Sequence, residues 1–206
     1  MTTVMRRFAS GTPVGDKNQI TFLQRHVPTV SGPILEIGSE DYGSTSSFRT
    51  VYPSNEYIGL DMAPGDGVDK IIDLAEGIGD LQENYFSLIV CCSVLEHVSK
   101  PWKMAENITK LIAPGGTLYM SVPWVWRYHA YPDDYFRFSV RGIEALFPDF
   151  TWKHPTYSTN IDGEFVSLDK LTVDNNLAKF VKVGEKQQRK YLPYLMVNMI
   201  GEKHPE

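Results

Sequence analysis

The chain alternates short apolar runs with amphipathic segments from residue 19 onward. Apolar runs bounded by turn-forming residues predict strands, and they cover residues 33–37, 56–61, 68–72, 86–92 and 117–122. Apolar residues at helical spacing predict helices over 19–27, 44–51 and 101–113. The helix over 101–113 has a proline in its first turn, and Pro114-Gly115-Gly116 is expected to end it. This alternation predicts a Rossmann-like, mostly parallel α/β sheet with helices on both faces.

The later part of the chain is aromatic and less regular. The segment VPWVWRYHAYPDDYFRFS precedes a helix predicted over residues 140–147, which Pro148 ends. Two further strands are expected at 150–157 and 194–200, whereas the polar stretch 160–190 supports no prediction.

Charge and composition limit the classes of partner and the cellular location that we expect. The 206 residues include 20 Lys and Arg against 25 Asp and Glu, a net charge of -5, so we expect no nucleic-acid partner. Cys91 and Cys92 are adjacent and poorly placed to bridge each other, which favours a reducing, cytoplasmic location. No run of 18 apolar residues occurs, so neither a membrane span nor a signal peptide is expected.

The stretch ILEIGSEDYGSTSSF has the order strand, tight turn and helix that binds nucleotide-like ligands at the carboxyl edge of such a sheet. It lacks the Gly-x-Gly-x-x-Gly signature, and it places Glu36, Glu40 and Asp41 around the turn. These carboxylates would repel a pyrophosphate and attract a cation. S-adenosylmethionine suits this charge pattern because it carries a sulfonium and an ammonium group and no phosphate.

Two further acids fall at the same edge of the sheet. Asp61 ends the second predicted strand 23 residues after Gly38, a spacing typical of a carboxylate that accepts hydrogen bonds from ribose hydroxyls. Asp73 follows the third strand, and the loop after Cys92 follows the fourth. Both are available to the adenine and methionine ends of a nucleoside ligand.

The collinear motifs LEIGSEDYG, YIGLDM, IIDL, FSLIVCCSVLEHV and LIAPGGTLYMSVP resemble the class I S-adenosylmethionine-dependent methyltransferases over residues 33–123. The resemblance implies methyl transfer and a seven-stranded sheet with one antiparallel strand near the C-terminus. It also implies a single methyltransferase domain over 1–206, with an N-terminal helical segment 1–32, a cofactor-binding core 33–123 and a substrate-side part 124–206. The cofactor-binding residues carried over by position are Glu36, Gly38, Ser39, Gly43, Asp61, Met62, Asp73, Leu74, Cys92 and Ser93.

Within that set, Asp61 resembles the ribose acid and Asp73 the acid on the adenine side. Cys92 and Ser93 resemble the backbone contact after the fourth strand. The chain departs from the family at two places: the glycine motif is reduced to Gly38 and Gly43, and Ser87 stands where an acid often begins the fourth strand.

The segment RYHAYPDDYFRFS is the candidate for recognition of a small-molecule acceptor, because aromatic rings and directed polar groups are mixed in it. It is similar to a segment of small bacterial methyltransferases associated with surface-polysaccharide assembly, which implies a sugar or polysaccharide-precursor acceptor. Its alternative role is a lid-to-helix connection packed on the sheet. The candidate catalytic bases are His129 and Asp134, and the candidate substrate contacts are Tyr131, Asp133, Tyr135 and Arg137.

Other interpretations stay open. Glu96 and His97 lie where the family begins a helix beside the cofactor, and a packing role is as well supported. No metal-binding spacing emerges from His97, His129 and the cysteines, so no metal is expected. The rival functions are a scaffolding protein that binds the cofactor without transferring a group, and a nicotinamide-dependent oxidoreductase, which the acidic loop disfavours.

Overall fold

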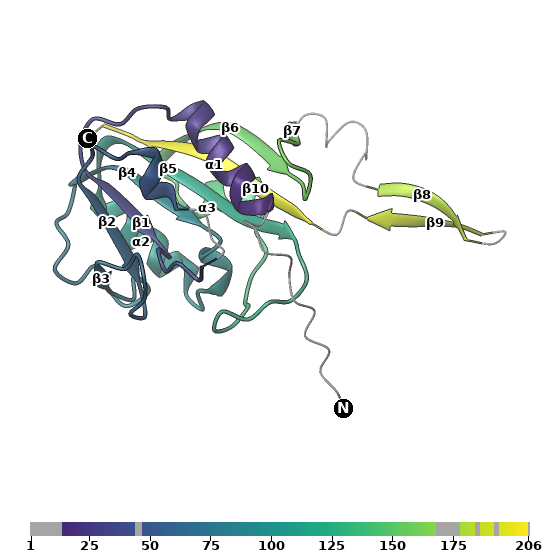
Figure 1. The fold of residues 1–206 in the computed structure, drawn as a ribbon, viewed down its shortest axis with the longest axis horizontal. Coiled ribbons are helices and arrows are strands. Elements are labelled where there is room, and N and C mark those ends of the chain that lie inside the picture. The colour runs from purple at the N-terminus through teal and green to yellow at the C-terminus, as the bar shows by residue number, and fades with distance from the viewer. Residues whose placement is uncertain (1–13, 44–46, 168–177, 184–185, 192–193, 206) are drawn as a thin grey trace.

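The computed structural model describes residues 14–43, 47–167, 178–183, 186–191 and 194–205. Its centre is an eight-stranded sheet in the order β3-β2-β1-β4-β5-β10-β6-β7 (Figure 1). The strands are β1 (Ile34–Ile37), β2 (Tyr57–Asp61), β3 (Lys70–Ile71), β4 (Phe86–Cys92), β5 (Ile112–Val125), β6 (Phe150–Ser158), β7 (Phe165–Ser167) and β10 (Leu195–Lys203). A second, two-stranded sheet pairs β8 (Ala178–Val183) with β9 (Lys186–Tyr191).

The predicted Rossmann-like architecture is confirmed. Strands β3, β2, β1, β4 and β5 pair in parallel, and β10 pairs antiparallel with both β5 and β6. The expected number of seven strands is wrong by one, because β7 adds an edge strand antiparallel to β6. Strand β7 has three residues and lies in the polar stretch for which the sequence supports no prediction.

Strand β4 occupies the middle of the parallel part and is apolar on both sides. Leu88 and Val90 face the cluster that contains Phe22, whereas Ile89 and Cys91 face the cluster that contains Ile108. A strand covered on both faces needs apolar residues at consecutive positions, which explains the continuous run FSLIVCC.

Helices cover the two faces of the sheet (Figure 1). Helix α1 (Val14–His26) and the short 3₁₀ helix η1 (Phe48–Val51) contribute to one core cluster, and α2 (Pro101–Leu111) and α3 (Val140–Leu146) contribute to the other. The helix predicted over 44–51 is limited to η1 among the described residues, since 44–46 lie outside them. In the described part of the chain, no helix is both long and apolar enough to cross a membrane.

Helix α2 passes into β5 without the expected break. The helix ends at Leu111, and Pro114-Gly115-Gly116 lies inside β5. The amides of Asn84 and Tyr85 donate to the carbonyls of Lys110 and Leu111, at 2.8 and 2.9 Å. Because the segment before β4 satisfies these final carbonyls, the chain enters the sheet directly.

Candidate functional site

The described residues enclose a cavity of about 560 Å³ at the carboxyl ends of β1, β2 and β4. Parallel α/β sheets bind ligands at this edge. Carboxylates dominate its polar lining, whereas Arg49 is the one guanidinium group that the described residues contribute to it. The carboxylates belong to Asp16, Glu36, Glu40, Asp41, Asp61, Asp66 and Asp73.

Glu36 places a carboxyl group at the wall of this cavity from the middle of β1. The hydroxyl of Tyr57 donates to its Oε2 at 2.7 Å. Burial raises the pKa of Glu36 to about 7, against the lowering effects of the Tyr57 hydrogen bond and the Arg49 charge. A cation bound beside Glu36 would favour the ionised form of this group.

The turn after β1 depends on Gly38. Its φ is +75°, and an added Cβ would lie 2.3 Å from Cγ2 of Val94, so a side chain here would clash as well as strain the backbone. Ser39 lines the cavity, and its buried hydroxyl has no hydrogen-bond partner among the described residues. Gly43 does not line the cavity; its amide donates to Oδ1 of Asp41 at 2.7 Å and closes the loop.

The acids after β2 and β3 also cap their own turns. Oδ1 of Asp61 accepts from the amides of Met62 and Ala63, at 2.7 and 3.3 Å, whereas Oδ2 has only a long contact of 3.4 Å with the amide of Glu40. Oδ2 therefore keeps acceptor capacity toward the cavity. Asp73 similarly accepts from the amide of Ala75 at 2.8 Å through Oδ1. Met62 and Leu74, which follow these acids, line the cavity as well.

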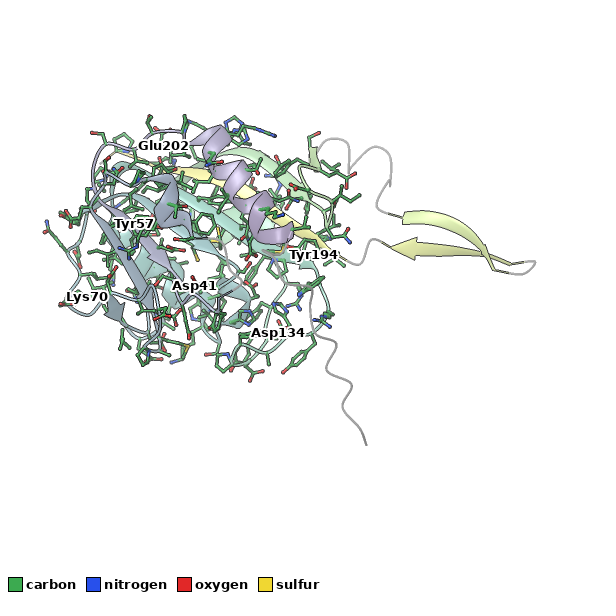
Figure 2. All side chains as sticks on the ribbon, in the orientation of Figure 1. Asp41, Tyr57, Lys70, Asp134, Tyr194 and Glu202 are labelled. Atoms are coloured by element: carbon green, nitrogen blue, oxygen red, sulfur yellow. The ribbon has the colours of Figure 1, made fainter. Side chains whose placement is uncertain are left out.

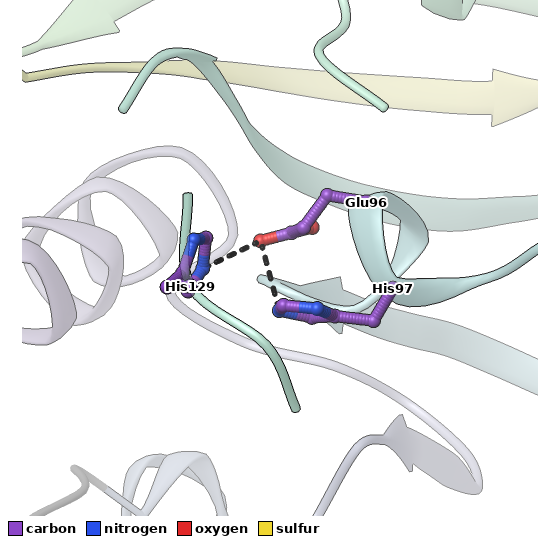
Figure 3. Close-up of side chains that lie close together, drawn as sticks. All are labelled: Glu96, His97 and His129. Carbon is purple, nitrogen blue, oxygen red and sulfur yellow. Dashed lines mark ion pairs between the residues drawn. The ribbon is translucent and has the colours of Figure 1, made fainter. Parts of the chain in front are cut away.

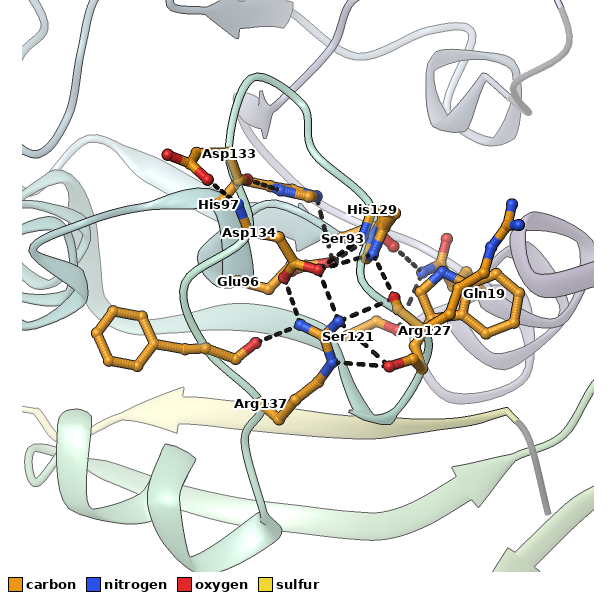
Figure 4. A network of polar contacts seen from close by, with 12 residues as sticks. Gln19, Ser93, Glu96, His97, Ser121, Arg127, His129, Asp133, Asp134 and Arg137 are labelled. Carbon is orange, nitrogen blue, oxygen red and sulfur yellow. Dashed lines mark hydrogen bonds and ion pairs between the residues drawn. The ribbon is translucent and has the colours of Figure 1, made fainter. Parts of the chain in front are cut away.

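Cys92 and Ser93 line the cavity at the end of β4. Ser93 has a positive φ of 56°, and its amide donates to the carbonyl of Ser121 at 2.8 Å. Gln19, on α1, donates from Nε2 to the hydroxyls of Ser93 and Ser121, at 3.0 and 3.1 Å (Figure 4). Helix α1 therefore holds the end of β4 in place through Gln19, which also lines the cavity.

The segment after β5 is held together by Arg137 (Figure 4). The guanidinium forms an ion pair with Asp134 and donates to the carbonyls of Trp126, Arg127 and Phe136. The Arg137 hydrogen bonds hold the pKa of Asp134 well below its usual range. Asp134 also accepts from the amide of His129 at 2.7 Å, so this pair positions His129 rather than facing the cavity.

The same segment supplies two residues to the cavity, His129 and Tyr131. The ring of Tyr131 lies 5.8 Å from the ring of Tyr42, which comes from the turn after β1. Burial lowers the pKa of His129. Figure 2 shows Asp41 and Asp134 on the same side of the molecule, where these two segments approach each other.

A buried carboxyl group lies behind the two histidines of the cavity. Glu96, in the 3₁₀ helix η2 (Leu95–His97), has a side chain that is 1% exposed, and its Oε1 lies 3.8 Å from Nε2 of His97 and 4.0 Å from Nε2 of His129 (Figure 3). Burial raises the pKa of Glu96 to about 8. The structure thus groups Glu, His and His side chains although their spacing along the chain showed no metal-binding pattern.

The cavity brings together eleven of the residues predicted from the sequence: Glu36, Gly38, Ser39, Asp61, Met62, Asp73, Leu74, Cys92, Ser93, His129 and Tyr131. The other five lie outside its lining: Gly43, Asp133, Asp134, Tyr135 and Arg137. Their hydrogen bonds explain this position, because Asp133, Asp134 and Arg137 use their polar groups within the segment after β5. Tyr135 is half exposed, and its amide donates to the carbonyl of Glu96.

Sequence reasoning missed several lining residues, notably Gln19 and Arg49, and it left the role of His97 open between the cofactor side and packing. Gln19 belongs to a helix that precedes the first strand, and Arg49 follows the glycine turn, so neither is part of a strand-end motif. A Glu-His dipeptide alone is no metal signature, because the third member, His129, comes from a different segment.

Comparison with known proteins agrees with this geometry. Residues 42–120 match the family described as a methyltransferase domain. A stretch of 47 residues, 23% of this chain, is 38% identical to the ubiquinone biosynthesis O-methyltransferase of Methylococcus capsulatus. That stretch spans 20% of the length of the relative.

Solved structures share the fold at low sequence identity. The YcgJ protein from Bacillus subtilis superimposes with a TM-score of 0.61 and 12% identity, over 92% of this chain and 99% of that chain. The 1,6-didemethyltoxoflavin-N1-methyltransferase of Burkholderia thailandensis superimposes with a TM-score of 0.59 and 14% identity. The match covers 93% of this chain and 79% of that chain. Residues 42–120 thus match a methyltransferase domain, and the fold of the chain is the one found in the Burkholderia methyltransferase.

Proposed function

We propose that this chain transfers a methyl group from S-adenosylmethionine to a small-molecule acceptor. The observation that carries the proposal is the acidic cavity at the carboxyl edge of a methyltransferase fold, to which the described residues contribute seven carboxylates and one guanidinium. Such a lining favours a ligand with a sulfonium and an ammonium group and disfavours a pyrophosphate. This charge pattern argues against the nicotinamide-dependent oxidoreductase.

The described residues fit this cofactor. Oδ2 of Asp61 has acceptor capacity for ribose hydroxyls, and Asp73 lies at the next strand end for the adenine side. Glu36 and the exposed backbone at Gly38 suit the methionine end, where an ammonium group would offset the burial of the Glu36 carboxyl. Ser39, Met62, Leu74, Cys92 and Ser93 complete the proposed cofactor contacts, and Gly43 shapes the loop without touching the cavity.

S-adenosylmethionine supplies an electrophilic methyl group when bound. The chain contributes alignment of the acceptor and exclusion of water. His129 lies at the cavity wall with its pKa lowered by burial, so it is neutral near pH 7 and able to take a proton at Nε2. Asp134 and Arg137 act on the reaction through the position of His129 and are positioning residues in this proposal.

The chemical class of the acceptor is proposed from the aromatic residues at the mouth of the cavity. Tyr42 and Tyr131 are each more than half exposed there and offer ring faces for a sugar or another ring. The similarity of the segment around Tyr131 to that of bacterial polysaccharide-associated methyltransferases supports a sugar or polysaccharide-precursor acceptor. The names of the Methylococcus and Burkholderia proteins likewise point to small molecules.

Calorimetry tests the cofactor, and label transfer tests the reaction. We expect S-adenosylhomocysteine to bind and NADH to give no heat of binding at the same concentration. Methyl-labelled cofactor with cell extract should then give a labelled small molecule. Binding without labelled product would favour the scaffolding protein, and binding of NADH alone would overturn the proposal.

A further inference from the structure

Three potential ligand atoms converge where the loop after β4 meets the segment after β5. They are Oε1 of Glu96 and Nε2 of both His97 and His129, and all lie within 4.8 Å of one another. Figure 3 shows the Glu96 carboxyl between the two rings. We propose that Glu96, His97 and His129 bind a divalent transition-metal ion.

The hydrogen bonds of the two rings orient them for this role. Nδ1 of His97 lies 2.6 Å from the carbonyl oxygen of Asp133, and Nδ1 of His129 lies 3.2 Å from the carbonyl oxygen of Arg127. A carbonyl only accepts, so in each neutral ring Nδ1 carries the proton and Nε2 carries a lone pair. Metal-binding histidines have this arrangement, with the second nitrogen donating to a carbonyl or carboxylate.

Without a cation, this arrangement is incomplete. When Glu96 is ionised, two imidazole lone pairs and a carboxylate oxygen meet with no donor between them. The other oxygen of Glu96, Oε2, is buried and has no hydrogen-bond partner among the described residues. A buried carboxylate of this kind needs a paired charge or a metal. A cation between the three groups satisfies all of them at once.

The donor set indicates the class of ion. Two imidazoles and one carboxylate suit Zn²⁺, Co²⁺, Mn²⁺ or Fe²⁺, whereas Mg²⁺ and Ca²⁺ prefer oxygen ligands alone. Metal–ligand bonds of about 2.0 to 2.2 Å place neighbouring ligand atoms roughly 3.0 to 3.4 Å apart. The present separations of 3.8 and 4.0 Å from Oε1 therefore require only a small inward rotation of the rings.

The position of the cluster suggests a use for the ion. His97 and His129 line the cavity and Glu96 lies behind them, so an ion held by the three side chains would lie at the cavity wall. An acceptor hydroxyl bound there would have a lower pKa, and His129 would serve as a ligand in place of a base. This use rests on the proposed function, whereas metal binding itself does not.

The test uses the full chain without a polyhistidine tag, freed of metal by a chelator and then dialysed. Titration with Co²⁺, followed by visible absorption, and with Zn²⁺, followed by calorimetry, should give one ion per chain. Loss of a residue that only hydrogen-bonds to a metal ligand lowers metal affinity roughly 10- to 100-fold. Glu96 is proposed as a ligand itself, so Glu96→Gln should lower the affinity at least about 100-fold. His129→Gln, at a more exposed side chain, repeats the test if Glu96→Gln does not fold.

A matched control is His154→Gln. His154 stacks on His26 with ring centroids 4.2 Å apart, and this is the other stacked or edge-on histidine pair among the described residues. The control should keep wild-type affinity. Absence of saturable binding, equal affinity of folded Glu96→Gln, or loss of binding in His154→Gln would each overturn the proposal. Calorimetry with S-adenosylhomocysteine on the same samples reports the cofactor site separately, so the two proposals fail independently.

Discussion

His97 donates from Nδ1 to the carbonyl oxygen of Asp133 at 2.6 Å, which joins the loop after β4 to the segment after β5. The amides of Tyr135 and Phe136 add hydrogen bonds to the carbonyl of Glu96, at 2.8 and 3.2 Å. The walls of the cavity that carry His97 and His129 are therefore one hydrogen-bonded unit. Its geometry depends on how residues 126–137 fold.

Asp134→Asn should destabilise the hydrogen-bonded unit that carries His97 and His129. The side chain is 2% exposed and loses its charge-assisted bonds to Arg137, which should lower the free energy of unfolding by about 2 kcal/mol at pH 7. Because the pKa of Asp134 is lowered in the folded state, its contribution is present above the unfolded pKa and is lost as the pH falls. Urea unfolding at pH 7 and pH 3 should show a smaller difference between variant and wild type at pH 3.

Glu144→Gln is the matched control for that variant. Glu144 also pairs with an arginine three residues away, but the Arg141 side chain is 81% exposed. Its loss should change stability by less than about 0.5 kcal/mol. Equal losses in both variants would contradict a special role for Asp134.

Asp61→Asn should weaken binding of S-adenosylhomocysteine about 10- to 100-fold, because hydrogen bonds from ribose to a charged acceptor are worth about 1.5 to 3 kcal/mol. Asparagine keeps one oxygen for the amides of Met62 and Ala63, so the turn is expected to stay folded. Calorimetry measures the change. Asp80→Asn, at an exposed acid paired with Lys70 outside the cavity, should bind as wild type does, and unchanged affinity in Asp61→Asn would remove Asp61 from the site.

Glu96→Gln should change the pH dependence of stability when a chelator is present. Burial raises the pKa of Glu96 to about 8, so the folded state binds more protons than the unfolded state between the ordinary glutamate pKa of 4.5 and about 8. Stability of the wild type should therefore fall as the pH rises through this window, by at most about 1.4 kcal/mol per pH unit. The variant should lose that slope.

Glu36→Gln gives a comparison within the same cavity. Its carboxyl has a pKa raised to about 7, so this variant should flatten the curve only between 4.5 and about 7. Urea unfolding at half-unit intervals of pH distinguishes the two windows. Parallel curves for wild type and Glu96→Gln would show that Glu96 does not titrate in this range.

His129→Gln should leave the affinity for S-adenosylhomocysteine nearly unchanged and reduce methyl transfer by roughly 10² to 10⁴. If His129 takes the acceptor proton, wild-type transfer rises with pH through a limb that lies below 6.5, because burial lowers the pKa of this ring. That limb should be absent from the variant. If His129 holds a metal, a chelator should abolish wild-type transfer, and normal transfer by folded His129→Gln would exclude both roles.

The segment 124–138 should become more protected from hydrogen exchange when cofactor and acceptor bind. His129 and Tyr131 of this segment line the cavity. Loops that close on a substrate commonly become ordered when the substrate binds. Mass spectrometry of the exchanged peptides measures this, with residues 101–111 of α2 as the internal reference. Equal exchange with and without ligands would assign the segment a purely structural role.

The regular core could be predicted from sequence because each element carries its own periodicity. The run FSLIVCC is continuous because β4 is covered on both faces, and Met104, Ile108 and Leu111 are buried on one side of α2. The strand-end acids could be placed for the same reason, since the fold fixes where parallel strands end. Strand β7 escaped prediction because its three residues pair only at an edge.

The role of the segment after β5 could not be derived in this way. Aspartate and arginine in an aromatic loop suggest ligand contacts. Arg137 instead donates its hydrogen bonds to Asp134 and to nearby carbonyls. Composition alone does not reveal whether a polar side chain is used inside a loop or toward a ligand. The grouping of Glu96 with His129 likewise depends on tertiary contacts.

The place of β10 has a consequence for synthesis of the protein on the ribosome. This strand is the last in chain order, yet it lies between β5 and β6 and pairs with both. Until residues 195–203 emerge, the nascent chain holds β5 and β6 with open edges and leaves the apolar partners of Val197 and Met199 uncovered. Completion of the sheet therefore waits for residues 195–203, and the half-built sheet is the species that chaperones would meet before then.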